Sequence, residues 1–243
     1  MKFTTTAFVF ILSLTHLFGQ TKKANLEIHH LTGDFYIYIT YQDIDGSPYP
    51  ANGMYLVTKA GAVLFDTPWD TTQFQPLLDS IRVKHHVEVV MGFATHFHED
   101  RTAGLEFLKQ KGIKTFTTKE TDRLSAARGK KRAEFLISKD TSFLVGQHSF
   151  QTYYGGPGHA PDNIVFWINK EKILYGGCLI KSAEATTLGN LSDANVKEWP
   201  NSIRNIQKKF GQPAFVIPGH QKWTKDAMEH TLKLIRQYEA NPY

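Results

Sequence analysis

The sequence has a single cysteine, Cys178, among its 243 residues, which excludes an intramolecular disulfide. It has one long apolar run near the amino terminus, residues 7–14, and no other stretch apolar enough to span a membrane. It also has no short-period repeat and no low-complexity linker. The chain therefore fits neither a disulfide-stabilised scaffold nor a repeat architecture, and its length fits one large domain.

The apolar run near the amino terminus follows Met1-Lys2 and precedes Gly19-Gln20, the order found in a secretory signal peptide. We expect residues 1–19 to be a cleaved signal peptide and residues 20–243 to form a single domain. An uncleaved anchor is the alternative, although the run is short for a membrane span. Export would place the mature chain in the periplasm, without stable membrane association. A lone thiol in that oxidising compartment needs burial or ligation to escape modification.

The net charge of +5 makes nucleic acid the obvious rival partner. The only tight basic run is Gly129 to Arg132, which has no interleaved aromatic residues and which we interpret as a solvated helix end. We therefore expect no nucleic-acid partner. The positive charge favours anionic small molecules weakly, through long-range steering.

Hydrophobic periodicity predicts strands followed by strand–helix units, and this order occurs twice along the chain. We expect strands near 26–31, 35–40, 53–58, 62–66, 87–94, 115–117, 142–145, 148–153, 163–168, 172–175 and 215–217. We expect helices near 72–84, 103–111, 120–128, 196–210 and 223–238. The pattern indicates an α/β domain of two sheets packed face to face with helices outside, its two halves meeting near residue 130.

The segment His96-Phe97-His98-Glu99-Asp100 is the most informative part of the chain. In an extended or loop backbone successive side chains alternate between faces, so His96, His98 and Asp100 can converge on one side. Neutral imidazole and carboxylate are zinc ligands. The segment follows the apolar run 87–94, which we interpret as a buried strand, and α/β proteins usually place chemistry at such strand ends.

Three later residues occupy similar places beside glycine: His159 follows a Gly/Pro turn and precedes an expected strand, while Cys178 and His220 each follow an apolar strand. Glycine beside a ligand lets the backbone approach closely where a Cβ atom would clash. Any one of them alone is explained more simply as a core histidine or an inert buried thiol. Four strand ends that each deliver His, Cys or Asp are hard to explain as packing.

These candidate ligands are too many for one tetrahedral zinc and suit two zinc ions, each completed by water. We expect a neutral site of three histidines beside a site with two anionic ligands: His96, His98 and His159, then Asp100, Cys178 and His220. Because Asp100 follows His98 closely, the two metals would be near neighbours that a hydroxide could bridge.

These motifs make the chain resemble a class B metallo-β-lactamase, of the di-zinc subclass with a three-His site beside an Asp-Cys-His site. The resemblance covers essentially the whole mature chain and includes Asp66-Thr67-Pro68-Trp69, Cys178-Leu179-Ile180-Lys181 and Gly189-Asn190. It implies a four-layer αββα sandwich of two mixed sheets. It also implies zinc-dependent hydrolysis of the β-lactam amide bond of penicillins, cephalosporins and carbapenems by metal-bound hydroxide, without a covalent acyl-enzyme, conferring antibiotic resistance.

The resemblance further implies roles for residues around the metals. Lys181 would bind the carboxylate of the β-lactam substrate, a task that suits a compact point charge. Asn190 would donate a hydrogen bond to the developing oxyanion, and Asp100 would orient the hydroxide. Asp66 ends a strand beside the site, where it either orients a ligand or loop or caps the loop.

A segment from Tyr41 to Pro50 joins two expected strands, and the resemblance makes it a mobile flap over the zincs. Ile44, Tyr49 and Trp69 would then give apolar contacts to substrate side chains. The alternative is an ordinary hairpin loop.

Two alternatives to a β-lactamase remain at this point. Thioesterases and lactonases of the same fold usually carry His-x-His-x-Asp-His and a bridging aspartate, whereas this chain has Arg101 and Cys178 at those places. Guanidinium cannot ligate zinc, so these two residues favour the β-lactamase. A non-catalytic periplasmic zinc-binding protein is the second alternative, but three ligands per zinc leave an open position that storage does not need. The serine β-lactamase motifs Ser-x-x-Lys and Lys-Thr-Gly are absent, and we expect a monomer.

Overall fold

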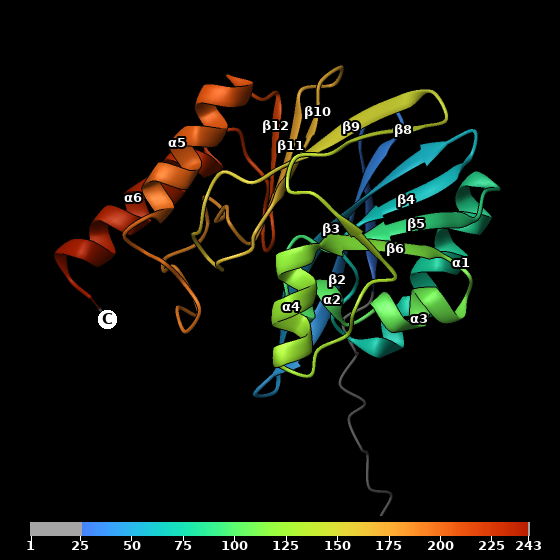
Figure 1. Cartoon of the computed structure of the whole chain (residues 1–243), viewed down its shortest axis with the longest axis horizontal. Coiled ribbons are helices and arrows are strands. Elements are labelled where there is room, and N and C mark those ends of the chain that lie inside the picture. Colours follow the sequence, from blue (N-terminus) through green and yellow to red (C-terminus); the bar gives the residue numbers. More distant parts are fainter. Residues whose placement is uncertain (1–25, 243) are drawn as a thin grey trace, which may run out of the picture.

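The computed structural model describes residues 26–242, so the expected signal peptide lies outside the described residues. Within this range the strands form two sheets that pack face to face, and helices cover the outer face of each (Figure 1). The first half of the chain builds one sheet and the second half builds the other.

The first sheet has seven strands in sequence order: β1 (Glu27–Thr32), β2 (Phe35–Ile44), β3 (Ser47–Thr58), β4 (Gly61–Phe65), β5 (Val89–Phe93), β6 (Lys114–Thr118) and β7 (Phe135–Ile137). Pairing is antiparallel from β1 to β4 and parallel from β4 to β7. Parallel pairing requires crossover connections, which the helices of this half supply.

The second sheet has five strands, in the order β12 (Phe215–Pro218), β11 (Ile173–Gly177), β10 (Val165–Ile168), β9 (His148–Tyr153) and β8 (Ser142–Val145). Only β11 and β12 are parallel, and the other pairs are antiparallel. Both sheets are therefore mixed, as the family resemblance implies.

The helices belong to two groups. Those of the first half are α1 (Phe74–His85), which follows the 3₁₀ turn η1 (Thr71–Gln73), α2 (Glu99–Thr102), α3 (Leu105–Gln110) and α4 (Lys119–Ala127). Those of the second half are α5 (Trp199–Phe210) and α6 (Ala227–Ala240), which pack outside the second sheet (Figure 1).

The core lies in three apolar layers. The inner faces of the two sheets bury a cluster rich in phenylalanine, including Phe65, Phe93, Phe150 and Phe166. A second cluster lies between the second sheet and α5 and α6, and a third lies between the first sheet and the helices α1 and α3. Three apolar interfaces between successive layers give the four-layer αββα sandwich, so the expected fold class is confirmed.

The structure differs from the sequence prediction in several places. The short helix α2 was not expected, so Asp100 lies in a helical turn directly after His98 and not in an extended or loop backbone. Strand β7 was not expected, and because it joins the first sheet, the change to the second sheet falls between Ile137 and Ser142. The segment 41–50 is not a loop: β2 and β3 pair through it as far as Ile44 and Ser47, around a turn at Asp45-Gly46. The basic run from Gly129 directly follows the C-cap of α4, and the amides of Gly129 and Lys130 bond back to carbonyl oxygens of that helix, so the run lies at a helix end as expected.

No helix within residues 26–242 combines the length and the apolar character needed to cross a bilayer.

Candidate metal centre

The carboxyl ends of strands from both sheets meet at one edge of the sandwich. β4 and β5 lead there from the first sheet, and β11 and β12 lead there from the second. A cavity of about 510 Å³ opens at this edge. Ligands bind at the carboxyl ends of strands in many α/β proteins. Several of the metal ligands and substrate contacts predicted from the sequence line this cavity.

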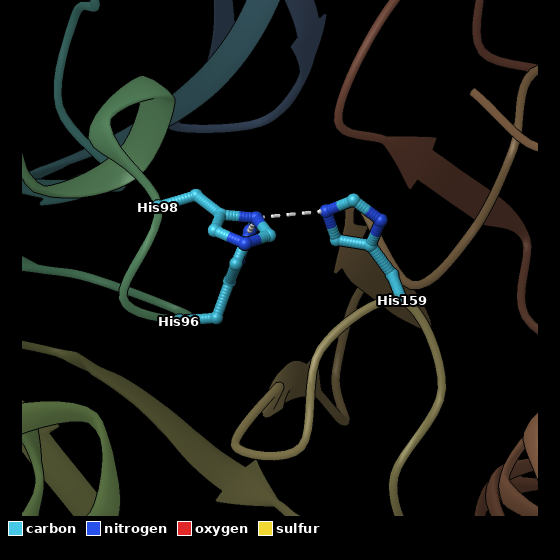
Figure 2. Close-up of side chains that lie close together, drawn as sticks. All are labelled: His96, His98 and His159. Atoms are coloured by element: carbon cyan, nitrogen blue, oxygen red, sulfur yellow. Dashed lines mark hydrogen bonds between the residues drawn. The ribbon is translucent and has the colours of Figure 1, made fainter. Parts of the chain in front are cut away.

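Three imidazoles meet at the cavity. Nδ1 of His98 lies 3.1 Å from Nε2 of His96 and 3.1 Å from Nε2 of His159. His96 and His98 come from the loop after β5, and His159 reaches across from the loop between β9 and β10 (Figure 2). His96 is fully buried and His159 nearly so. The three side chains form a candidate metal-binding group.

A second group of donors lies beside the first. Sγ of Cys178 is 3.2 Å from Oδ2 of Asp100 and 3.4 Å from Nε2 of His220, and the last two atoms are 3.2 Å apart. His96, Asp100 and Cys178 also offer ligand atoms within 4.8 Å of one another. All the residues predicted to bind metal therefore converge, although each sheet supplies only part of the set.

Outer partners fix the tautomers of three imidazoles. The Oγ1 hydroxyl of Thr95 donates to Asp66, so it accepts from Nδ1–H of His96 at 3.2 Å. Nε2–H of His98 donates to Oδ2 of Asp193 at 3.1 Å. Nδ1–H of His220 donates to the carbonyl oxygen of Pro50 at 2.8 Å. In each case the nitrogen that faces the cavity keeps its lone pair, as a metal ligand must.

Charge and burial also suit a cation at the centre. Burial holds the pKa of His96 and of His159 well below the usual value, and it lowers the pKa of His220, so these imidazoles stay neutral. Burial opposes ionisation of Asp100, but the guanidinium of Arg101 and the bond to His220 hold its pKa well below the usual range. Convergent imidazole lone pairs beside a carboxylate fit a divalent metal such as zinc.

Cys178 lies at the end of β11, with a side chain almost wholly buried. Without a metal, burial raises the pKa of its thiol, although Arg101 acts in the opposite direction. Zinc binds thiolate, so metal binding and loss of this proton are coupled. A Cβ atom at Gly219 would stand 2.6 Å from Sγ of Cys178, which confirms that glycine is needed for close approach here.

Arg101 is buried beneath the second donor group. Its guanidinium contacts Oδ2 of Asp100 at 3.0 Å and Oδ2 of Asp66 at 3.4 Å. It also donates to the carbonyl oxygens of Asn52 and Gly219. A buried cation needs such compensation. Arg101 therefore supports Asp100 and the backbone beside His220, in keeping with the expectation that it is not a ligand.

Asp66 is fully buried at the end of β4. Its carboxylate accepts from the backbone amide and the hydroxyl of Thr95, at 2.7 and 3.0 Å, and from the hydroxyl of Tyr175 at 2.8 Å. Because Thr95 in turn fixes the ring of His96, Asp66 orients both the loop and a candidate ligand.

The residues expected to contact substrate line the same cavity: Lys181, Asn190, Ile44, Tyr49 and Trp69. Burial lowers the pKa of Lys181, while Cys178 and Asp100 act in the opposite direction. The hairpin of β2 and β3 brings Ile44 and Tyr49 to the rim, where both are about two-fifths exposed, and the ring of Tyr49 lies 5.1 Å from that of His220.

Sequence reasoning missed the partners that position the ligands, above all Asp193 and Arg128. Both line the cavity, and the carboxylate of Asp193 joins the guanidinium of Arg128 to the ring of His98. Lys130, read as a solvated residue, pairs with Glu99 at 2.8 Å on the cavity wall. These contacts join residues that are far apart in the sequence, so no sequence motif with a fixed spacing could have revealed them.

Comparison with known proteins agrees with this geometry. The sequence model of the Metallo-beta-lactamase superfamily matches residues 46–220. A metallo-beta-lactamase type 2 from Elizabethkingia meningoseptica is 43% identical over 236 residues, which are 96% of this chain and 94% of that protein. Metallo-beta-lactamase IND-1 from Chryseobacterium indologenes is 41% identical over 85% of this chain and 87% of that one.

Solved structures agree as well. Metallo-beta-lactamase IND-7 superposes with a TM-score of 0.84 and 40% identity, over 87% of this chain and 98% of that one. A metallo-beta-lactamase from Pontibacter korlensis gives a TM-score of 0.84 and 33% identity, over 87% and 99% of the two chains. The family match includes every candidate ligand, so the chain belongs to the metallo-β-lactamase superfamily and is a metallo-β-lactamase, a hydrolase of β-lactams.

Proposed function

We propose that this enzyme hydrolyses the β-lactam amide bond of penicillins, cephalosporins and carbapenems with two zinc ions and without a covalent acyl-enzyme, and that it thereby confers antibiotic resistance. The observation that carries the proposal is the pair of adjacent donor groups, with nitrogen lone pairs already directed inward. The names of the similar proteins supply the substrate class. The enzyme would work in the periplasm as one domain, residues 20–243, after loss of residues 1–19.

His96, His98 and His159 would hold one zinc, and Asp100, Cys178 and His220 would hold the other. Zinc, when bound, would lower the pKa of a water from ~15.7 toward ~7 and polarise the lactam carbonyl. The protein contributes the arrangement: neutral rings, an ionised Asp100, and outer partners that hold each ligand in place.

Lys181 would bind the substrate carboxylate. Its side chain is half-buried at the cavity beside the ring of Trp199, with Nζ 5.4 Å from the ring centroid. Burial disfavours the ammonium charge, and a substrate carboxylate would restore a partner for it. Binding energy would thus come from a charge-assisted bond to a cation that the folded protein has already partly removed from water.

Asn190 would donate to the oxygen of the lactam carbonyl as negative charge develops there. Its own carbonyl oxygen Oδ1 accepts from the amide of Ser192 at 2.9 Å, so the NH₂ group would be the part that donates to substrate. Asp100 would accept a hydrogen bond from the attacking water and orient it toward the carbonyl carbon. Both residues line the cavity with Lys181.

A thioesterase or lactonase of the same fold is the second candidate function. Arg101 argues against it, because its guanidinium fills the space behind Asp100 and His220 with hydrogen bonds to the backbone and cannot bind metal. The buried thiol of Cys178 takes part in the donor group instead.

Parallel hydrolysis assays distinguish the two functions. We expect the zinc-loaded enzyme to hydrolyse nitrocefin and imipenem, to lose this activity in EDTA and to regain it when zinc is restored. S-lactoylglutathione should be hydrolysed with a kcat/KM at least ~100-fold lower. We expect this because an enzyme discriminates between substrates by how tightly it binds their transition states. Hydrolysis of the thioester with no attack on either β-lactam would contradict the proposal.

A further inference from the structure

Arg128 and Asp193 form an ion pair at the cavity wall that joins two distant parts of the chain. Arg128 follows the last residue of α4, and Asp193 lies in the loop that also carries Asn190. Nη2 of Arg128 is 2.8 Å from Oδ1 of Asp193. The other carboxylate oxygen, Oδ2, lies 3.1 Å from Nε2 of His98. One carboxylate therefore connects the end of α4 to a candidate zinc ligand.

The surroundings of this pair make it more than a surface contact. The side chain of Asp193 is only 14% exposed, whereas that of Arg128 is 49% exposed. The guanidinium of Arg128 also lies over the ring of Phe97, 5.2 Å from its centroid, and Phe97 stands between His96 and His98.

We propose that Arg128 is a positioning residue that acts through Asp193 on His98. The inference rests on the proposed function, since His98 is the ligand that it serves. By holding Oδ1, Arg128 turns Oδ2 toward Nε2–H of His98, and this bond keeps the lone pair of Nδ1 directed at the metal. An outer partner that fixes ring orientation in this way typically changes metal affinity 10–100-fold.

The test measures zinc affinity by competition with a chelator, in the absence of substrate. Arg128→Met keeps an apolar stem against Phe97 and removes the guanidinium. We expect its zinc affinity to fall about tenfold, at the lower end of the range for such partners, and Asp193→Ala to fall further. Arg128→Lys, which keeps the charge, should recover part of the loss.

Arg123→Met is the matched control. Arg123 lies in α4, the helix that Arg128 follows, and also forms an ion pair, at 2.7 Å, but its partner Glu120 is in that helix and neither residue lines the cavity. We expect wild-type zinc affinity for this variant. Equal affinities for Arg128→Met, Arg123→Met and the wild type would overturn the proposal.

A double variant separates the route through Asp193 from other routes. If Arg128 acts through that carboxylate, adding Arg128→Met to Asp193→Ala should weaken zinc binding no further than Asp193→Ala alone. Losses that multiply would show that Arg128 acts through Phe97 or through stability, and would overturn the route proposed. Because no substrate is used, these results stand apart from the hydrolysis assays: failure of those assays refutes the proposed function and leaves the affinities measurable.

Discussion

At the scale of single residues, the centre depends on compensation of buried charge. Among the described residues, Arg101 is the one arginine or lysine that is buried. It lies beneath the candidate metal ligands and forms ion pairs with the carboxylates of Asp66 and Asp100. Removing one partner from a buried ion pair typically costs about 3–5 kcal/mol, because the other charge is left uncompensated. Zinc adds positive charge to the same region, so the acids serve both the fold and the metal.

Asp162 is a buried acid outside the donor groups, 2% exposed. Burial raises its pKa to about 7, against the effect of the Thr121 hydroxyl, whereas an unfolded aspartate titrates near ~3.9. Between these pH values the native state binds more protons than the unfolded state, so this group lowers stability as pH rises from ~4 to ~7.

We predict that Asp162→Asn gains stability relative to the wild type as pH rises through this window, by about 3 kcal/mol between pH 5 and pH 8. Denaturant unfolding of both proteins at pH 5 and pH 8 measures the difference. Asp45→Asn, a change of an exposed acid at the hairpin turn, is the control and should show no such trend. A stability difference between Asp162→Asn and the wild type that is the same at both pH values would contradict the account.

The candidate ligands could be predicted from sequence because His, Cys and Asp recur near the ends of several apolar strands. His96, His98 and Asp100 share one short segment, and Cys178 is the only cysteine. Asp193 and Arg128 could not be found in this way. An acid in a loop and a basic residue after a helix are common on surfaces, and only the folded chain brings them to His98.

At the scale of elements, the hairpin of β2 and β3 shapes the entrance to the cavity. Its strands stay paired as far as the turn at Asp45-Gly46, so Ile44 and Tyr49 stand on an ordered ribbon and not on a loose loop. Both are large apolar side chains left partly exposed at the rim of a polar centre. Such exposure is typical of a binding surface.

We predict that Ile44→Ala raises KM for nitrocefin about fivefold with little change in kcat, because losing about 1 kcal/mol of apolar contact weakens ground state and transition state alike. Val83→Ala is the control, since Val83 is 70% exposed on α1 and does not line the cavity. Steady-state kinetics measure both. An unchanged KM for Ile44→Ala would mean that the hairpin does not contact substrate.

Strands with strong apolar runs were predictable, and the exceptions have physical reasons. β7 is a three-residue edge strand, too short for a periodic signal, and it forms by parallel pairing with β6. The segment 41–50 contains two prolines and a glycine, which usually interrupt strands. Here Pro48 and Pro50 lie within β3, and cross-strand pairing with Asp43 and Tyr41 keeps the hairpin regular.

At the scale of the whole molecule, the centre lies between the two halves of the chain. The first half supplies His96, His98 and Asp100, and the second supplies His159, Cys178 and His220. The two sheets must therefore pack correctly before either donor group is complete. A metal that binds only the folded state stabilises it by mass action, so zinc would strengthen the packing of the two sheets.

The most direct test of this account is the zinc content of the purified protein after dialysis against low zinc. We predict two zinc ions per chain for the wild type and one for Cys178→Ser, which loses the thiolate but keeps the three-His group, together with at least a ~100-fold fall in imipenem hydrolysis. Equal zinc content and undiminished turnover in the two proteins would contradict the claim that two metals share this cavity.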